Sequence, residues 1–270
     1  MLKFTSIGDC CVDVYPQFNQ AFLGGSAFNA CLSAQELKAK TTLVSAVGTD
    51  SWSKKYFTVC QKLQINSQFL TSLPGKTSHV AINLDQHHSP IFSQWQLGAL
   101  ENFQLNSSHH NFLSTQTAVT CTAIKPLEKI LNKFSQMNLP GVLKSADFDG
   151  DTPYSFSVQD IPQYFSGLGL AAKSLNSADA KSLNLLKNLA IKQNKMILVT
   201  LGSHGSQVFT KNKDFFQPAI KTKAADTTGA GDAYLAAFII HYLKTKNIQN
   251  AMAAATQAAA QKITRLGASS

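Results

Sequence analysis

The amino-acid sequence predicts an α/β fold in which a mostly parallel central sheet carries helices on both faces. Short apolar runs alternate with helical segments along most of the chain, as in parallel strands joined by crossover helices. Met196–Thr200 is almost entirely apolar, which is typical of a strand buried on both faces. Two hairpin-like stretches interrupt the alternation, and the first of them predicts a small β lid.

Composition favours a folded globular protein. The chain has 270 residues, of which 44% are hydrophobic, enough for a sizeable core. The N-terminus lacks the apolar stretch of a secretory signal, and no window is long enough to span a bilayer, so we expect no membrane association. The five cysteines include no C-x-x-C pair, so we expect reduced thiols in a cytoplasmic protein and no zinc site.

The net charge of +9 raises the question of nucleic-acid binding, because lysines can neutralise phosphates. All but one of the 24 basic residues are lysine, and Arg265 is the only arginine. Specific base recognition favours the planar guanidinium of arginine. We therefore expect a solvated lysine surface and no nucleic-acid partner.

In the first part of the chain, polar residues follow the predicted strands. Asp9 and Asp13 come after the first strand, and Asp50 follows the second. Ligands of open α/β sheets bind at this carboxyl edge. The predicted elements here are strands at 2–8 and 42–47 and helices at 24–37 and 51–63.

The stretch 77–97 departs from the strand and helix alternation. Two strand-like runs, 78–84 and 91–97, flank the turn 85–90 with no helical segment between them. Together with residues 10–23 they predict a lid. The alternative is an ordinary edge hairpin.

The alternation resumes after residue 99 and continues to the end of the chain. We see no repeat or linker that would divide the sequence, so residues 1–270 are expected to form a single domain. The remaining predicted elements are strands at 116–121, 141–148, 170–175 and 196–200, a hairpin at 207–216, and helices at 126–137, 161–165, 176–193, 226–245 and 248–264.

The motif 226–232, Asp-Thr-Thr-Gly-Ala-Gly-Asp, combines a glycine-rich turn, a helix start and a carboxylate. Glycines let backbone N–H groups approach an anion, and the helix N-terminus attracts it. A carboxylate beside a bound phosphate can take a proton from an attacking hydroxyl. The motif therefore indicates phosphoryl transfer, with a tight loop or helix cap as the alternative.

These residues resemble the PfkB or ribokinase family of small-molecule kinases over nearly the full chain. The resemblance implies a ribokinase-like three-layer αβα sandwich with a β lid. Ala27 stands where a further glycine is common in the N-terminal signature, and the stretch 7–25 is most similar to fructoselysine 6-kinases. The matching residues are Gly24, Gly25 and Asn29, then Gly48 and Asp50, then Thr200, Gly202 and Gly205, then 226–232, and finally 264–268.

The resemblance assigns the chemistry to the motif. Asp232 is implied as the general base that takes the proton of a sugar hydroxyl. The backbone N–H groups of Gly229, Ala230 and Gly231 are implied as the anion hole. The alternative for Asp232 is a helix-capping acid.

ATP and Mg²⁺ are the implied cofactors, and a dependence on a monovalent cation is left open. Asp179 stands where the family carries the Glu of an Asn-x-x-Glu motif, and it would hold Mg²⁺ through water. The alternative for this segment is a plain N-cap. The implied nucleotide-binding residues are Asn176, Thr200, Gly202, Gly205, Thr228, Gly229, Gly231 and Thr256.

On the acceptor side, Cys11 stands where many relatives carry a substrate-binding Asn. The turn 147–151 has Asp149 and Asp151 where many relatives have Asn and Arg. These acids favour a substrate with a cationic amine, and the alternative is a solvated acidic turn. The implied acceptor-binding residues are Asp9, Asp13, Gly25, Asn29, Asp50 and Asp149.

The predicted reaction is transfer of the γ-phosphate of ATP to a primary hydroxyl of a sugar or of a fructosamine adduct such as fructoselysine. Fructose, ribose or a nucleoside are alternative acceptors. A sugar- or nucleotide-binding regulator without catalysis is the alternative of another class. A homodimer formed through the lid is a further expectation.

Overall fold

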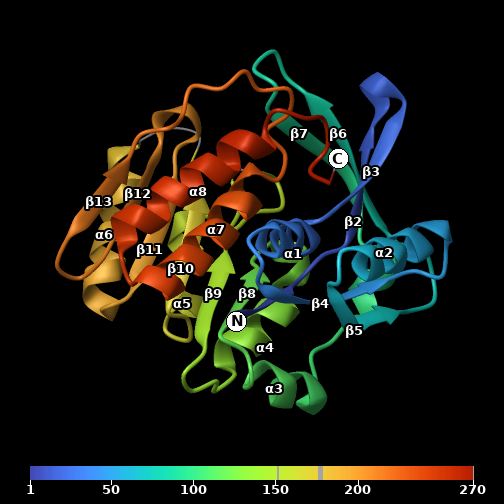
Figure 1. Cartoon of the computed structure of the whole chain (residues 1–270), viewed down its shortest axis with the longest axis horizontal. Helices are drawn as coiled ribbons and strands as arrows, with labels where there is room; N and C mark the ends of the chain where they lie inside the picture. The colour runs from blue at the N-terminus through green and yellow to red at the C-terminus, as the bar shows by residue number, and fades with distance from the viewer. Residues whose placement is uncertain (151, 176–178, 270) are drawn as a thin grey trace.

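The computed structural model describes residues 1–150, 152–175 and 179–269, and its centre is a long twisted sheet (Figure 1). Within the described residues this sheet has nine strands in the order β13-β12-β11-β10-β9-β8-β1-β4-β5. All neighbours from β11 to β5 run parallel, whereas β12 and β13 form an antiparallel end. The strands are β1 (Lys3–Ile7), β4 (Lys40–Val47), β5 (Asn66–Ser72), β8 (Ala118–Thr122), β9 (Leu143–Asp147), β10 (Leu170–Ser174), β11 (Met196–Thr200), β12 (Ser206–Phe209) and β13 (Asp214–Gln217).

Helices cover both faces of this sheet, which gives three layers (Figure 1). One apolar core lies under α1 (Ser26–Glu36), α7 (Ala230–Thr245) and α8 (Ile248–Lys262). α2 (Ser51–Lys62) packs with α1 over β4 and β5. The opposite face is covered by α3 (Ser107–Leu113), α4 (Glu128–Gln136), α5 (Pro162–Phe165) and α6 (Ala180–Gln193). Short 3-10 helices lie at Pro16–Phe18, Gly98–Asn102, Lys125–Leu127, Val158–Asp160 and Gly202–His204.

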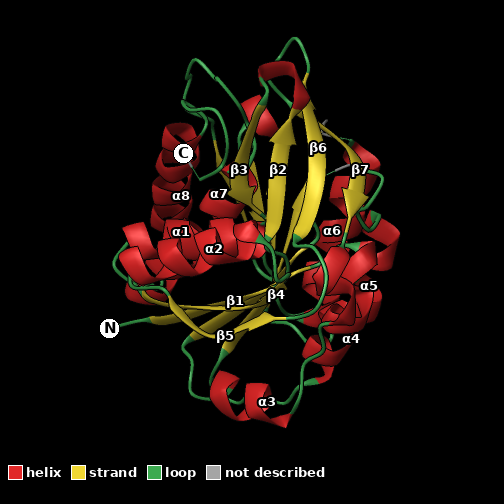
Figure 2. Cartoon of the chain, turned by 90° about the vertical axis from the view of Figure 1, so that its right-hand side faces the viewer, coloured by secondary structure: helices red, strands yellow, loops and turns green. Residues whose placement is uncertain are grey.

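A second, four-stranded sheet stands above the central sheet (Figure 2). Its order is β3-β2-β6-β7, with β2 and β6 parallel and the two outer pairs antiparallel. These strands come from the two stretches that the sequence predicts as the lid, and we call this sheet the lid. They are β2 (Cys11–Tyr15), β3 (Gln20–Gly24), β6 (Ser78–Leu84) and β7 (Pro90–Gln96).

Alternation along β2 sends its side chains to opposite faces of the lid. Val12 and Val14 pack towards α1 and α2. Cys11 and Tyr15 belong to the apolar cluster of the other face, together with Val80. Asp13 has the same parity as Cys11 and Tyr15, so β2 places a carboxylate on that second face.

The predicted fold is confirmed, although some elements are missing from the prediction. β5 and α3 have no counterpart in it, and β2 and β3 are foreseen only as part of a lid. β5 is an edge strand of mostly polar residues, so it lacks the apolar run that marks a buried strand. α3 is short and polar, and it depends on a capping box between Asn106 and His109.

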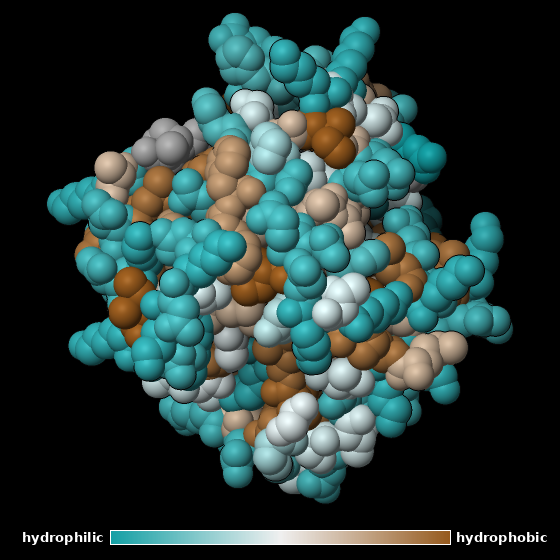
Figure 3. Space-filling model, turned by 60° about the vertical axis from the view of Figure 1, so that its left-hand side comes forward, coloured by the Kyte–Doolittle hydropathy of each residue, from teal (hydrophilic) through white to brown (hydrophobic). Residues whose placement is uncertain are grey.

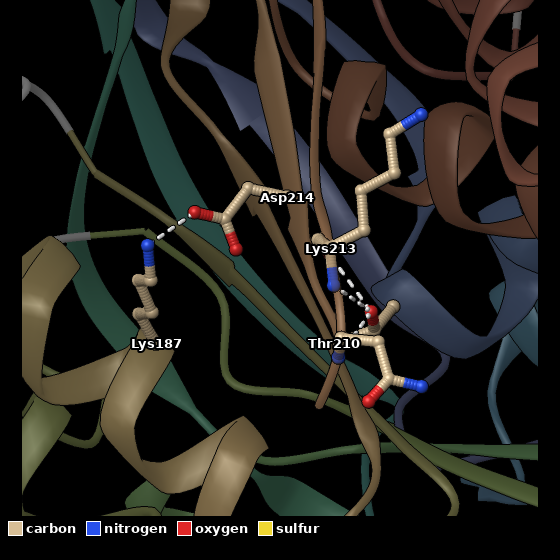
Figure 4. A network of polar contacts seen from close by, with 5 residues as sticks. Lys187, Thr210, Lys213 and Asp214 are labelled. Carbon is tan, nitrogen blue, oxygen red and sulfur yellow. Dashed lines mark hydrogen bonds and ion pairs between the residues drawn. The ribbon is translucent and has the colours of Figure 1, made fainter.

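The predicted hairpin at 207–216 is present as β12 and β13, at the far end of the sheet from β5. Thr210 closes its turn, because the Thr210 hydroxyl donates to the Lys213 carbonyl and accepts the Lys213 N–H (Figure 4). Lys187 of α6 forms an ion pair with Asp214 at the surface, which contributes little to stability. Figure 3 shows one face of the molecule mostly covered by polar side chains, with apolar ones scattered among them.

Among the described residues, no helix is long and apolar enough to cross a membrane.

Candidate active site

The predicted catalytic acid lies where α7 begins. Asp232 is in the first turn of α7, and the Asn29 amide of α1 donates to its Oδ2 at 3.0 Å. Burial raises the pKa of Asp232 well above its ordinary value, and the charges of Asp147, Asp9 and Asp149 add to the effect. A cation bound beside these carboxylates would lower the pKa again. Asp232 therefore has the environment of a group whose protonation depends on what the site holds.

The turn before Asp232 requires a glycine at the start of α7. Gly229 is the N-cap of α7 in the left-handed region, with φ of 77°. A Cβ at Gly229 would lie 2.7 Å from the Cβ of Ala268, so only glycine fits. The Ala230 N–H already donates to the Thr227 carbonyl at 3.2 Å. The predicted anion hole therefore relies on Gly229 and Gly231 more than on Ala230.

Asp9 follows β1 in the chain and contacts the start of α1. It is buried, and the backbone N–H groups of Ser26 and Ala27 donate to its carboxylate. Burial, reinforced by the charge of Asp149, nevertheless raises the pKa of Asp9 to about 6. Gly25 caps α1 with φ of 94°, and a Cβ there would lie 2.5 Å from the Asp9 carbonyl oxygen. Gly25 is therefore required to bring α1 against Asp9.

Three buried side-chain oxygens, on two neighbours of Asp232 and on a neighbour of Asp9, have no hydrogen-bond partner within the described structure. They are Oδ1 of Asp9, Oδ2 of Asp13 and Oδ1 of Asn29. Burial raises the pKa of Asp13 well above its ordinary value, with Asp9 and Asp226 adding to it. Gly24 makes room for this carboxylate, since a Cβ at Gly24 would lie 2.1 Å from it. Orphan acceptors of this kind are costly to bury, which indicates a site for ligand donors.

The acidic turn, which begins at Asp147, lies at the end of β9 and close to Asp9 and Asp232. The Asp149 N–H donates to Oδ1 of Asp147 at 3.0 Å, and the Ser155 hydroxyl donates to Oδ2 of Asp149 at 3.1 Å. The buried ammonium of Lys173 donates to the carbonyls of Phe148 and Gly150. Lys173 thus holds the backbone of the turn. Asp151, the other acid that the sequence singles out, lies outside the described residues.

The ends of β10 and β11, near Gly231, carry hydroxyl side chains. Thr200 at the end of β11 and Ser174 at the end of β10 are hydrogen-bonded, with 2.7 Å between their side-chain oxygens. A Cβ at Gly231 would lie 3.8 Å from Oγ of Ser174. Thr200 and the glycine turn are therefore neighbours, as expected for two parts of one phosphate site.

The other predicted nucleotide-binding residues differ in their surroundings. Gly202 has φ of 55° and open space around it, whereas a Cβ at Gly205 would lie 2.2 Å from the Gln217 carbonyl oxygen. The Thr256 hydroxyl donates to the Met252 carbonyl within α8. Thr228 directs both its N–H and its hydroxyl to Asp226. Asn176 lies outside the described residues.

Two predicted acids serve as helix caps in the structure. Asp50 accepts the N–H groups of Trp52 and Ser53 at the start of α2, and also the N–H and hydroxyl of Thr77 below the lid. Although burial opposes it, these bonds hold the pKa of Asp50 below its ordinary value. Asp179 caps α6 by accepting from Lys181 and Ser182. Their acceptor and metal roles stay predictions.

Sequence reasoning did not select Asp147 or Ser174 as site residues. Both end a strand of the sheet, at the edge where ligands bind. Their position at the end of a predicted strand was the one feature of the sequence that could have identified them as site residues. For Asp147 this signal was obscured by the two other acids that follow it, Asp149 and Asp151, and for Ser174 by the absence of a charge.

Asp147 gives a pH-dependent prediction for stability. Burial, with the charge of Asp149, raises its pKa from 3.8 to about 7. Between about pH 4 and 7 the folded protein therefore binds more protons than the unfolded chain, and stability falls as pH rises through this window. Asp147→Asn should raise the free energy of unfolding by up to about 4 kcal/mol at pH 8, since each unit of pKa shift corresponds to about 1.4 kcal/mol.

At pH 5 Asp147 is still protonated in the folded protein but is already ionised in the unfolded chain, so the gain of the Asn variant should be less than about half of that at pH 8. Urea unfolding of the ligand-free protein at both pH values measures the difference. An equal effect at pH 5 and pH 8 would contradict the shifted pKa.

Comparison with known proteins shows the family of the chain. The model of the pfkB family of carbohydrate kinases matches residues 10–125 and 166–270. The chain belongs to this family. It is therefore a sugar kinase, a phosphotransferase with a hydroxyl acceptor. The unmatched stretch 126–165 contains the acidic turn.

Relatives cover the chain almost completely. The fructoselysine 6-kinase of Shigella flexneri is 25% identical over 278 residues, covering 99% of this chain and 100% of the relative. A fructosamine kinase of Bacillus subtilis (strain 168) is 23% identical, with 96% and 90% covered. Fructokinase from Vibrio cholerae O395, solved with fructose, ADP and a calcium ion, superposes with a TM-score of 0.79 at 21% identity, with 99% and 94% covered. The similarity to the Vibrio cholerae structure supports the fold assigned to this pfkB-family protein.

Proposed function

We propose that this pfkB kinase transfers the γ-phosphate of ATP to a primary hydroxyl of a sugar that carries a cationic amine, such as fructoselysine. The observation that carries the proposal is a set of three orphan oxygens. Two are on Asp9 and Asn29, which are neighbours of Asp232, and the third is on Asp13, which adjoins Asp9. All three are acceptors, and the hydroxyls of a sugar are the donors that they lack.

Asp232 is the proposed base. Its carboxylate takes the proton of the acceptor hydroxyl while that oxygen attacks the γ-phosphorus, and the bond to the ADP oxygen breaks. Asn29 donates to Oδ2 of Asp232 and so orients the carboxylate. The N–H groups of Gly229 and Gly231, at the start of α7, stabilise the charge on the transferred group. Ser174 and Thr200 are the proposed neighbours of the phosphates.

Mg²⁺ would supply charge neutralisation on the phosphates when it is bound. The described residues contain no group of three or more His, Cys, Asp or Glu able to hold a metal ion. This fits an ion that keeps several waters and is bound chiefly by the phosphates. Asp179 is the proposed protein group that would contact it, through water.

The charge of the acceptor site favours a cationic substrate. The carboxylates of Asp9, Asp147 and Asp149 surround Asp232, and Asp13 adjoins Asp9. Such a group repels a free sugar phosphate and attracts an ammonium group. The similarity to fructoselysine and fructosamine kinases supports the same choice. Asp149 is the residue we propose to sense the amine.

Asp149→Asn tests the choice of acceptor. Asn tolerates the left-handed backbone at this position, where φ is 56°. We expect kcat/KM for fructoselysine to fall about tenfold, because one charge facing the amine is lost. For fructose, which has no amine, the change should stay below about threefold.

Asp214→Asn, at the far end of the sheet, is the matched control for loss of one charge, and it should change neither value. An equal loss on both acceptors would contradict amine recognition by Asp149. Ribose and a nucleoside belong in the same ADP-release assay, since turnover of either in preference to fructoselysine would replace the proposed acceptor.

A cytoplasmic location is also proposed, because all five cysteines are buried free thiols. Dimerisation through the lid stays a prediction, as does any dependence on a monovalent cation.

A further inference from the structure

A buried hydrogen bond joins the lid to the glycine-rich turn. Tyr15, the last residue of β2, is fully buried, and its hydroxyl donates to Oδ2 of Asp226 at 2.6 Å. It also lies 3.3 Å from the Thr228 hydroxyl. Burial and the hydrogen bond to Asp226 raise the pKa of Tyr15 far above its ordinary value, so the hydroxyl stays a donor.

Asp226 is the point at which three segments of the chain meet. Its Oδ1 accepts the N–H of Thr228 at 2.8 Å and the Thr228 hydroxyl at 2.6 Å. Its Oδ2 accepts the Gly267 N–H at 2.9 Å in addition to the Tyr15 hydroxyl. The carboxylate therefore fixes the residue before Gly229 and the C-terminal turn at the same time.

The C-terminal turn is held between the lid and Gly229. A Cβ at Gly267 would lie 2.8 Å from the ring of Phe22 on β3, and one at Gly229 would lie 2.7 Å from Ala268. Figure 1 shows this end of the chain beside the lid strands. The lid is therefore connected to Gly229 by two routes, through Asp226 and through the turn at 267–268.

A separate lid contact reaches the same turn. The Thr227 N–H donates to the carbonyl of His88, at the tip of the β6 and β7 hairpin, at 3.1 Å. Backbone contacts such as this bring the lid close to the glycine turn. The Tyr15 hydroxyl adds a buried, charge-assisted bond, which is about twice as strong as a neutral one.

We propose that Tyr15 is a positioning residue for phosphoryl transfer, which holds the turn 226–231 in its anion-binding conformation when the lid is seated. This inference rests on the proposed function of that turn as the anion hole. The Tyr15 hydroxyl acts through Asp226 and touches neither substrate. Its loss leaves the acceptor contacts of Asp9 and Asn29 in place, while the backbone donors at Gly229 and Gly231 lose their fixed position.

The test is Tyr15→Phe, which keeps the ring and removes the hydroxyl. Tyr164→Phe is a matched control, because the buried Tyr164 also donates to a carboxylate, Glu128, at 2.6 Å, but in the helical layer beneath the sheet. With ATP and fructoselysine, Tyr15→Phe should lower kcat about tenfold and change KM for the acceptor less than about threefold. Tyr164→Phe should leave kcat unchanged.

Equal stability losses in both variants with an unchanged kcat in Tyr15→Phe would show a purely structural hydroxyl and overturn the proposal. Asp226→Asn serves as the second variant. In the double variant with Tyr15→Phe, the losses in kcat should not multiply, because both changes break one network.

Amide hydrogen exchange of the ligand-free protein separates this inference from the proposed function. Exchange at 227–231 should be faster in Tyr15→Phe than in the parent and in Tyr164→Phe. That result together with no turnover of any acceptor by the parent would support the coupling and reject the kinase assignment of the site. Unchanged exchange at 227–231 would overturn the coupling, whatever the parent's activity.

Discussion

Asp232→Asn is expected to abolish nearly all turnover, lowering kcat by roughly 10²–10⁴-fold, the range typical of a lost general base. The amide keeps the size of the carboxylate and can still accept from Asn29, so the start of α7 should retain its structure. What is lost is the ability to take a proton from the acceptor hydroxyl. The measurement is ADP release at saturating ATP and fructoselysine, with calorimetric binding of both ligands.

Binding separates catalysis from mere ligand recognition in this experiment. We expect the affinities of Asp232→Asn for ATP and acceptor to stay within about threefold of the parent, because the proton transfer belongs to the transition state. Asp214→Asn should behave as the parent. If Asp232→Asn keeps the turnover of the parent, Asp232 is a helix cap. If the parent binds both ligands without turnover, the regulator alternative holds.

Periodicity was sufficient to predict the central sheet. Its parallel strands are buried on both faces, so each appears as an apolar run, as Met196–Thr200 illustrates. The glycine pair at 24–25 and the motif 226–232 were also visible, because close backbone approach restricts those positions to glycine. Gly25 and Gly229 show the restriction directly, since a Cβ at either would collide with a neighbouring segment.

Other site features depend on contacts between distant segments. Tyr15 and Asp226 are 211 residues apart, and nothing in the local sequence of either announces the other. Asp50 and Asp179 illustrate the reverse problem. Each follows a strand and precedes a helix, which suits a ligand contact and a helix cap equally well in sequence. The structure shows that both are helix caps, because the N–H groups of the following residues donate to their carboxylates.

Asp13→Asn is expected to lower activity strongly and to raise stability. Its buried Oδ2 has no partner among the described residues, so Asp13→Asn removes an acceptor that the proposed sugar hydroxyls need. We expect kcat/KM for fructoselysine to fall roughly 10²–10³-fold, since sites built to hydrogen-bond a hydroxyl discriminate strongly. KM for ATP, whose proposed contacts are Thr200 and the glycine-rich turn, should change little.

Stability distinguishes this role from a structural one. Burial, together with Asp9 and Asp226, raises the pKa of Asp13, so its charge opposes folding at neutral pH and Asp13→Asn should raise the free energy of unfolding by about 1 kcal/mol or more. Asp50→Ala is the contrasting control, because it removes the acceptor of four hydrogen bonds and should lower stability by about 1–2 kcal/mol. Urea unfolding at pH 8 measures both changes. A loss of stability in Asp13→Asn would show that Asp13 has a structural role. A gain of stability together with lost turnover is the result expected for a residue that binds the ligand at a cost to stability.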